Sequence, residues 1–152
     1  MEGLALQNRM NSGGRFLAPA LTGYKILVVE DNPEMRTLLT LMLRLQGAEI
    51  SSASSAREAL DLIRNESSFK LPDLILSDIA MPDEDGFSLI KKVRSLPLEK
   101  GGQIPAIAMT SFSGDEVRSN AKAAGFQAFL PKPLEPEELI HTITQLISHT
   151  VH

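Results

Sequence analysis

Hydrophobic and polar positions along this chain follow two periods in turn, that of a strand and that of a helix. Short apolar runs typical of buried strands are each followed by a longer segment with apolar residues three or four apart. The expected strands are KILVVE, AEISSA, DLILSD, IPAIAMT and QAFL, at residues 25–30, 48–53, 73–78, 104–110 and 127–130. The expected helices lie at residues 33–46, 55–65, 86–96, 113–124 and 136–148. This alternation predicts an α/β fold in which five helices flank a five-stranded parallel sheet, with right-handed crossovers.

Cap and turn residues set the expected ends of the helices. Asn32 is expected to cap the first helix with Pro33 in its first turn, and Gly47 follows its end. Asp85 is expected to cap the third helix, and Gly125 ends the fourth. The first helix is therefore expected to start three residues after Glu30, at one end of the sheet.

Composition narrows the class of protein. A chain of 152 residues with 43% hydrophobic and 22% charged residues fits one globular domain with a sizeable core. A net charge of -4 without a basic stripe argues against nucleic-acid binding, and the lack of cysteine excludes disulfides and thiolate chemistry. No run resembles a signal peptide or membrane span, so we expect a soluble, cytoplasmic protein with neither a membrane nor a nucleic-acid partner.

Domain limits follow from where the alternating pattern begins and ends. Residues 1–23 mix glycine, serine, proline and scattered apolar residues without a period, so we expect a flexible lead or linker. The domain is expected at 24–149, with a tail at 150–152. No output domain is expected within this chain.

Polar side chains follow four of the five expected strands. Glu30 and Asp31 end the first strand, Asp78 the third and Thr110 the fourth, while Lys132 follows the fifth. Ligands of open α/β sheets bind at the carboxyl ends of the strands, so these groups should share one rim. Crowded carboxylates raise one another's pKa and oppose ionisation. Hard oxygen ligands at such a rim suit Mg²⁺, with Mn²⁺ as a possible substitute, which would offset the repulsion.

The same groups have complementary roles in phosphoryl transfer. A carboxylate such as Asp78 can act as a nucleophile and form an aspartyl phosphate. Thr110 offers a hydroxyl donor and Lys132 a positive charge for phosphate oxygens. Phosphoryl transfer depends mainly on positioning and charge stabilisation, so these three residues are the candidate catalytic set.

In combination, these motifs resemble the receiver domain of two-component response regulators, over about residues 24–148. The resemblance rests on four segments in a fixed order: VVEDN, SDIAMPDEDG, AMTS and FLPKP. It implies a flavodoxin-like, doubly wound sheet with strand order 2-1-3-4-5. It also implies a Mg²⁺-dependent phosphoacceptor that receives its phosphoryl group from a histidine kinase or histidine phosphotransfer domain, and that is regulatory rather than an enzyme.

The resemblance assigns roles around the acidic rim. Asp78 matches the phosphoacceptor and one of the metal ligands. Glu30 and Asp31 match the acidic pair, with Asp31 as a direct metal ligand and Glu30 acting through water. The backbone carbonyl of Ala80 matches the remaining protein ligand.

Further roles are implied for residues of the switch. Thr110 matches the switch hydroxyl, Lys132 the phosphate-binding lysine and Phe129 the rotating aromatic residue. The bond between Lys132 and Pro133 matches the family's cis peptide. Phosphorylation is then expected to alter the face formed by the fourth helix, fifth strand and fifth helix, where a downstream protein would bind. The oligomeric state stays open between a monomer and a homodimer.

Two further expectations concern variable positions. Ala80 and Phe112 offer no polar group to orient an attacking water, so we expect a moderately long-lived phosphate. The resemblance places the donor's docking surface near the start of the first helix, where Leu41 and Leu45 widen the apolar stripe formed by Met35, Leu38, Leu39 and Met42. A broad stripe that faces only the core is the alternative.

Alternative functions and simpler interpretations stay open. A phosphohydrolase with an aspartyl nucleophile is one, although Glu30 and Asp31 are adjacent rather than at alternate positions and no nucleotide-binding glycine loop is present. A phosphate-independent interaction module is another. The receiver could act alone or belong to a hybrid sensor kinase. Solvated surface is the simpler interpretation for Arg118 and Lys122, and for the turn containing Asp83 and Glu84.

Overall fold

A single parallel sheet forms the centre of the molecule. The computed structural model describes residues 19–65, 70–112 and 114–148. In these ranges the strands are β1 (Lys25–Val29), β2 (Glu49–Ala53), β3 (Leu74–Asp78), β4 (Ala106–Thr110) and β5 (Ala128–Pro131). All neighbouring pairs are parallel, as the alternating pattern predicts, and the order is β2-β1-β3-β4-β5, as the family resemblance implies.

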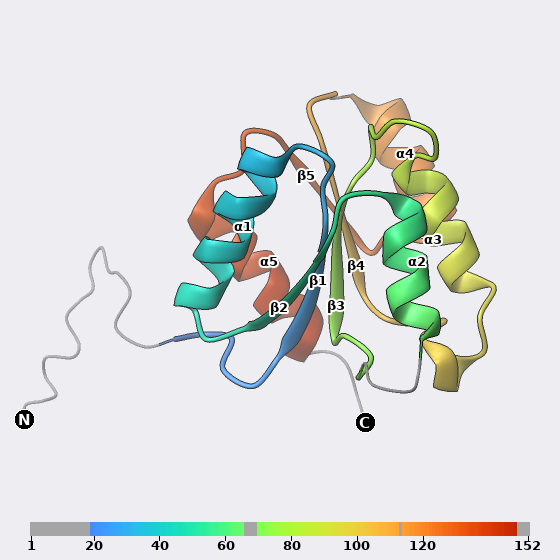
Figure 1. Cartoon of the computed structure of the whole chain (residues 1–152). Helices are drawn as coiled ribbons and strands as arrows, with labels where there is room; N and C mark the ends of the chain where they lie inside the picture. The colour runs from blue at the N-terminus through green and yellow to red at the C-terminus, as the bar shows by residue number, and fades with distance from the viewer. Residues whose placement is uncertain (1–18, 66–69, 113, 149–152) are drawn as a thin grey trace, which may run out of the picture.

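Helices cover both faces of this sheet. They are α1 (Pro33–Leu45), α2 (Ala56–Arg64), α3 (Gly86–Arg94), α4 (Asp115–Ala124) and α5 (Pro136–Ser148), with a short 3₁₀ helix, η1, at Leu98–Lys100. Figure 1 shows α1 and α5 on one side, and α2, α3 and α4 on the other. The predicted caps are confirmed, because Asn32 and Asp85 accept hydrogen bonds from backbone N–H groups in the first turns of α1 and α3, both at 2.9 Å.

The core divides into two apolar layers, one on each side of the sheet. Leu27 and Val29 of β1 face the α2, α3 and α4 side, while Ile26 and Val28 face α1 and α5. In β4 the same alternation places Ala106 and Ala108 toward α4, and Ile107 and Met109 toward α5. Burial on both faces explains the continuous apolar strands of the sequence.

The apolar stripe of α1 differs from the predicted one. Leu39 and Leu43 are fully buried, whereas Leu38, Leu41 and Leu45 are 51%, 56% and 73% exposed. The interpretation of a broad, core-facing stripe is therefore wrong. Only part of a helix faces the sheet, and successive residues point about 100° apart around its axis, so Leu39 is buried while the adjacent Leu38 is exposed.

Packing extends a short way before β1. Leu21 is fully buried, its N–H donates to the carbonyl oxygen of Gln46 at 2.8 Å, and the Ala20 N–H donates to the Gln46 side chain at 3.1 Å. The rest of the expected lead, residues 1–18, and the expected tail, 150–152, lie outside the described residues. Within the described ranges, no helix combines the length and apolar character that crossing a membrane requires.

Candidate functional site

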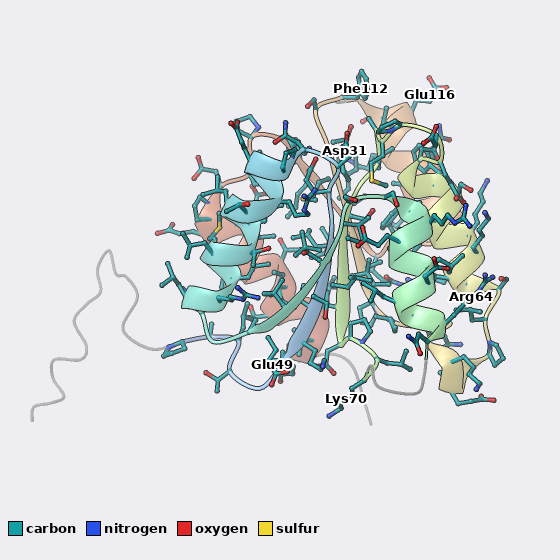
Figure 2. The ribbon with its side chains drawn as sticks, viewed as in Figure 1. Asp31, Glu49, Arg64, Lys70, Phe112 and Glu116 are labelled. Atoms are coloured by element: carbon teal, nitrogen blue, oxygen red, sulfur yellow. The ribbon has the colours of Figure 1, made fainter. Side chains whose placement is uncertain are left out.

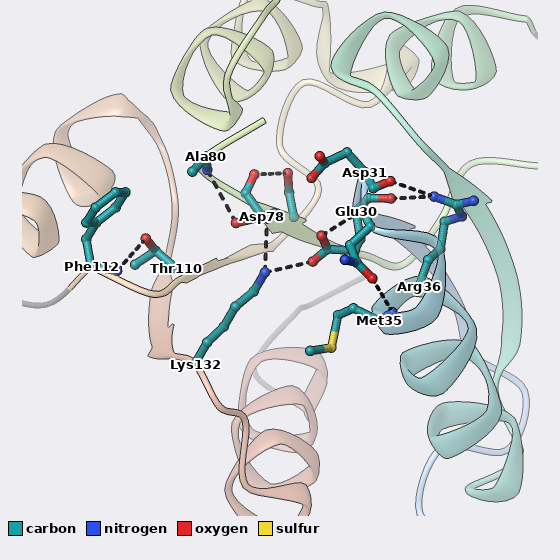
Figure 3. Close-up of polar contacts among 11 residues, drawn as sticks. Glu30, Asp31, Met35, Arg36, Asp78, Ala80, Thr110, Phe112 and Lys132 are labelled. Atoms are coloured by element: carbon teal, nitrogen blue, oxygen red, sulfur yellow. Dashed lines mark hydrogen bonds and ion pairs between the residues drawn. The ribbon is translucent and has the colours of Figure 1, made fainter. Parts of the chain in front are cut away.

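Four of the predicted side chains meet at the carboxyl edge of the sheet. Glu30, Asp31 and Asp78 each place a carboxylate oxygen within 4.8 Å of the others. Lys132 Nζ lies 2.9 Å from Glu30 Oε1 and 3.1 Å from Asp78 Oδ2 (Figure 3). These four residues come from distant parts of the sequence but form one polar cluster. They meet because β1 and β3 pair in parallel and β5 runs in the same direction at the edge of the sheet.

The acidic pair is held firmly by the start of α1. Glu30 is 1% exposed, and its Oε2 accepts from the Asn32 N–H at 3.2 Å. Arg36 reaches back along the helix, and its NH1 donates to the carbonyl oxygens of Glu30 at 2.8 Å and Asp31 at 3.4 Å (Figure 3). Sequence reasoning missed Arg36, because an arginine that binds backbone carbonyls leaves no distinctive motif.

Asp78 ends β3 and is 5% exposed. Its Oδ1 accepts from the Ala80 N–H at 3.3 Å. Gly86 begins α3 close to this strand end, and its N–H donates to the Ile79 carbonyl at 2.8 Å. A Cβ atom at Gly86 would overlap the Asp78 carbonyl oxygen, so glycine permits this approach. Asp78 is thus fixed by the turn after β3 rather than by acting as a helix cap.

Burial and ion pairing shift two pKa values in the cluster. Burial raises the pKa of Glu30, a shift that the hydrogen bond from Lys132 only partly offsets. Burial alone would lower the pKa of Lys132, but its hydrogen bonds to Glu30 and Asp78 outweigh this and raise it. Lys132 is therefore protonated and positively charged, and its single charge lies among three carboxyl groups.

This donor set fits a hard divalent cation. Carboxylate oxygens are the ligands that Mg²⁺ and Mn²⁺ prefer, and the oxygens of Glu30, Asp31 and Asp78 lie close enough to share one ion. The excess of acidic groups over the single ammonium favours additional positive charge. The residues present therefore fit Mg²⁺.

The two predicted switch residues lie on the neighbouring strands β4 and β5. Thr110 is fully buried, and its Oγ1 accepts from the Phe112 N–H at 3.0 Å (Figure 3). Phe112 is 61% exposed and lies at the same end of the molecule as Asp31 (Figure 2). Phe129 is half-buried in β5 and packs against the apolar layer on the α4 side. The bond between Lys132 and Pro133 is cis, as expected.

Two expectations of plain solvated surface need correction. The Arg118 guanidinium lies over the Phe129 ring, 4.8 Å from its centroid. Glu84 pairs with Lys92 at 2.6 Å and accepts from Ser88 Oγ at 2.7 Å, which lowers the pKa of Glu84. The Arg118 contact joins α4 to β5, and the Glu84 contacts join the turn after β3 to α3. These contacts depend on how the chain folds, so residue type alone did not reveal them.

Comparison with known proteins gives a consistent family match. Residues 26–144 match the family described as response regulator receiver domain. The uncharacterized 14.6 kDa protein in the sodA1 3′ region of Leptolyngbya boryana is 48% identical over 120 residues, covering 79% of this chain and 87% of that protein. The transcriptional regulatory protein ZraR of Escherichia coli K12 is 33% identical over 125 residues, covering 82% of this chain. The chain spans only 26% of ZraR.

A solved structure extends the likeness to three dimensions. It is the receiver domain of the sensor histidine kinase PA1611 from Pseudomonas aeruginosa PAO1, with a magnesium ion coordinated in the active site cleft. The TM-score is 0.73 at 31% identity, covering 84% of this chain and 99% of that one.

Proposed function

The chain belongs to the response regulator receiver domain family, and we propose that it is a phosphoacceptor switch whose Asp78 takes a phosphoryl group from a histidine kinase or histidine phosphotransfer domain. One observation carries the proposal. Asp78, at the end of β3, lies 3.1 Å from the Lys132 ammonium within a cluster of three carboxyl groups. This arrangement supports roles for Asp78 as the nucleophile, for Lys132 as the cation that binds phosphate oxygens, and for the carboxyl groups as metal ligands.

The chemical step needs few groups from the protein. A carboxylate oxygen of Asp78 attacks phosphorus, the bond from phosphorus to the donor's imidazole nitrogen breaks, and that nitrogen keeps the electron pair. Asp31, Asp78 and the Ala80 carbonyl would hold Mg²⁺ or Mn²⁺ directly, with Glu30 acting through water. When bound, the metal supplies positive charge that offsets both the acidic cluster and the incoming phosphoryl oxygens. The Lys132 ammonium lies 3.1 Å from Asp78, which supports a role for it in binding a phosphate oxygen.

Phosphorylation would then shift a conformational equilibrium. It adds roughly -1.5 to -2 charge and strong acceptor oxygens at Asp78. Thr110 would exchange the Phe112 N–H for a phosphate oxygen, and Phe129 would move into the space that Thr110 leaves. The face of α4, β5 and α5 would change in consequence and bind a downstream protein.

The outer face of α1 supports the proposed donor contact. Leu38, Leu41 and Leu45 form an exposed apolar row on a helix that starts two residues after Asp31. A helical donor could cover these leucines while its phosphohistidine reaches Asp78. Ala80 and the apolar Phe112 support a phosphate that outlasts seconds, since neither side chain can orient water.

Labelling by a small phosphodonor tests this function. Wild-type protein incubated with acetyl phosphate and Mg²⁺ should gain the mass of one phosphoryl group, and should gain it poorly after chelation of the metal. Asp78→Asn should abolish the gain, whereas the control Asp83→Asn, in the neighbouring turn, should not. Unlabelled wild type would instead favour a phosphate-independent module, and steady turnover of phosphate esters would favour a phosphohydrolase.

A further inference from the structure

Arg118 makes a contact for which the phosphoryl chemistry gives no reason. Its guanidinium lies 4.8 Å from the centroid of the Phe129 ring, which is cation–π geometry. Within residues 19–65, 70–112 and 114–148, no carboxylate lies within ion-pair distance of Arg118. The aromatic ring is therefore the partner of this guanidinium among the described residues.

The sheet places Phe129 beside Thr110. Phe129 is paired with Ala108 in β4, and Thr110 is paired with Pro131. Side chains alternate along a strand, so Ala108, Thr110 and Phe129 all project toward the α4 side. Phe129 is half-buried and its ring lies under Arg118. Its strand partner Ala108 is small, so little side-chain bulk from that residue would oppose movement of the ring toward Thr110.

We propose that Arg118 is a positioning residue that holds Phe129 outward in the unphosphorylated protein. This inference rests on the proposed function, in which Phe129 moves inward after phosphorylation. Inward movement separates the ring from the guanidinium and loses their attraction, so Arg118 biases the switch toward its resting state. At a solvent-exposed site, such a contact changes the ratio of the two states by about 2- to 5-fold.

Lys122 provides a matched control. It lies one turn after Arg118 on α4 and lines the same cavity of about 260 Å³, together with Ala121, Phe126 and Phe129. No ring contact is found for Lys122 in the part of the chain that the structure describes. Arg118→Met removes the charge while keeping an aliphatic side chain of similar reach, and Lys122→Met makes the same change in charge one turn away.

The test combines the ring signals of Phe129 with the extent of labelling. Phenylalanine-labelled protein is observed by NMR before and after treatment with acetyl phosphate and Mg²⁺, and Phe129→Leu assigns the ring signals. In unphosphorylated Arg118→Met, the ring signals should move toward the positions seen after phosphorylation. The size of the movement should correspond to a change of about 2- to 5-fold in the ratio of the inward to the outward state. Lys122→Met should match wild type, and intact mass should show full labelling of all three proteins that retain Phe129.

Different results separate the two claims. If labelling is normal but the Phe129 signals of unphosphorylated Arg118→Met coincide with those of wild type, the positioning role is overturned while the proposed function stands. An equal displacement in Lys122→Met also overturns it, since a general loss of positive charge would then explain the effect. Failure to label wild type overturns the proposed function together with the role of Arg118 in switching.

Discussion

Glu30, Asp31 and Asp78 share a small volume with the ammonium of Lys132. The Glu30 and Asp78 carboxylates are stabilised by that charge and by backbone N–H groups, yet the mutual repulsion of the three acids remains. A cluster of this kind lowers stability in the absence of a metal and gains stability when one binds. These acidic residues therefore lower the stability of the metal-free protein in return for metal binding.

Replacing one acid should reveal this trade directly. Asp31→Asn should stabilise the metal-free protein by about 1 kcal/mol, because it removes one of the repelling charges. It should also lose the stabilisation by Mg²⁺, which for wild type is about 1.4 kcal/mol at ten times the dissociation constant. Thermal unfolding with and without Mg²⁺ measures both effects, with Asp83→Asn as control. Equal stabilisation of wild type and Asp31→Asn by Mg²⁺ would remove Asp31 from the site.

Lys132 should give the site a distinct pH dependence. Lys132→Met leaves Glu30 buried without its cation, which should cost about 3 kcal/mol at pH 7. Burial already raises the pKa of Glu30 above its ordinary value of 4.5. The protonated Glu30 carboxyl group therefore stabilises the folded state fully below pH 4.5, and this stabilisation is lost as pH rises through the folded-state pKa. The variant should therefore lose less stability, relative to wild type, at pH 5 than at pH 7. Urea unfolding at both values measures this, and an equal loss would contradict it.

Among the elements, the end of α3 is tied to two other segments by one side chain. Arg94 donates to the Gly125 carbonyl through Nε at 3.0 Å and NH2 at 2.8 Å, and to the Gly102 carbonyl at 3.1 Å. NH2 also donates to Gln127 Oε1 at 3.0 Å, and that oxygen accepts from the Ala106 N–H. The guanidinium therefore joins α3, the loop after η1 and the turn between α4 and β5.

Loss of this junction should destabilise the fold without blocking the chemistry. Arg94→Met should lower the free energy of unfolding by about 2 kcal/mol, because several carbonyl oxygens lose their donor. Arg94→Lys should recover little, since an ammonium lacks the planar fork that spans these acceptors. Asp78 labelling by acetyl phosphate should persist in the folded variants. A loss below about 0.5 kcal/mol, as expected for a surface change such as Arg64→Met, would refute the structural role.

For the whole molecule, the proposed coupling runs from Asp78 through Thr110 to the face of α4, β5 and α5. Thr110→Ala should still be labelled, because the hydroxyl is not the nucleophile. The phosphate-dependent changes in backbone NMR signals should then shrink to the surroundings of Asp78. Changes in α4, β5 and α5 equal to those of wild type would show that coupling follows another route.

Sequence alone could predict the layers of this fold, because buried parallel strands and amphipathic helices have distinct periods. The order of the strands came from the family resemblance, since periodicity does not encode which strands pair. Glu30, Asp31, Asp78 and Lys132 could be placed together because all follow strand ends. The exposure of Leu38 could not be predicted, because it depends on the rotation of the helix about its axis. The contacts of Arg36 and Arg118 could not be predicted either, because they depend on where long side chains reach backbone carbonyls or an aromatic ring.

A crystal structure with Mg²⁺ and beryllium trifluoride, which mimics a bound phosphoryl group, tests the central claim most directly. The account predicts the mimic on a carboxylate oxygen of Asp78, with Lys132 Nζ and Thr110 Oγ1 each within hydrogen-bond distance of a fluorine. Thr110 would by then have left the Phe112 N–H. A mimic bound elsewhere, or one bound at Asp78 with Lys132 turned away and Thr110 still bonded to Phe112, would contradict it.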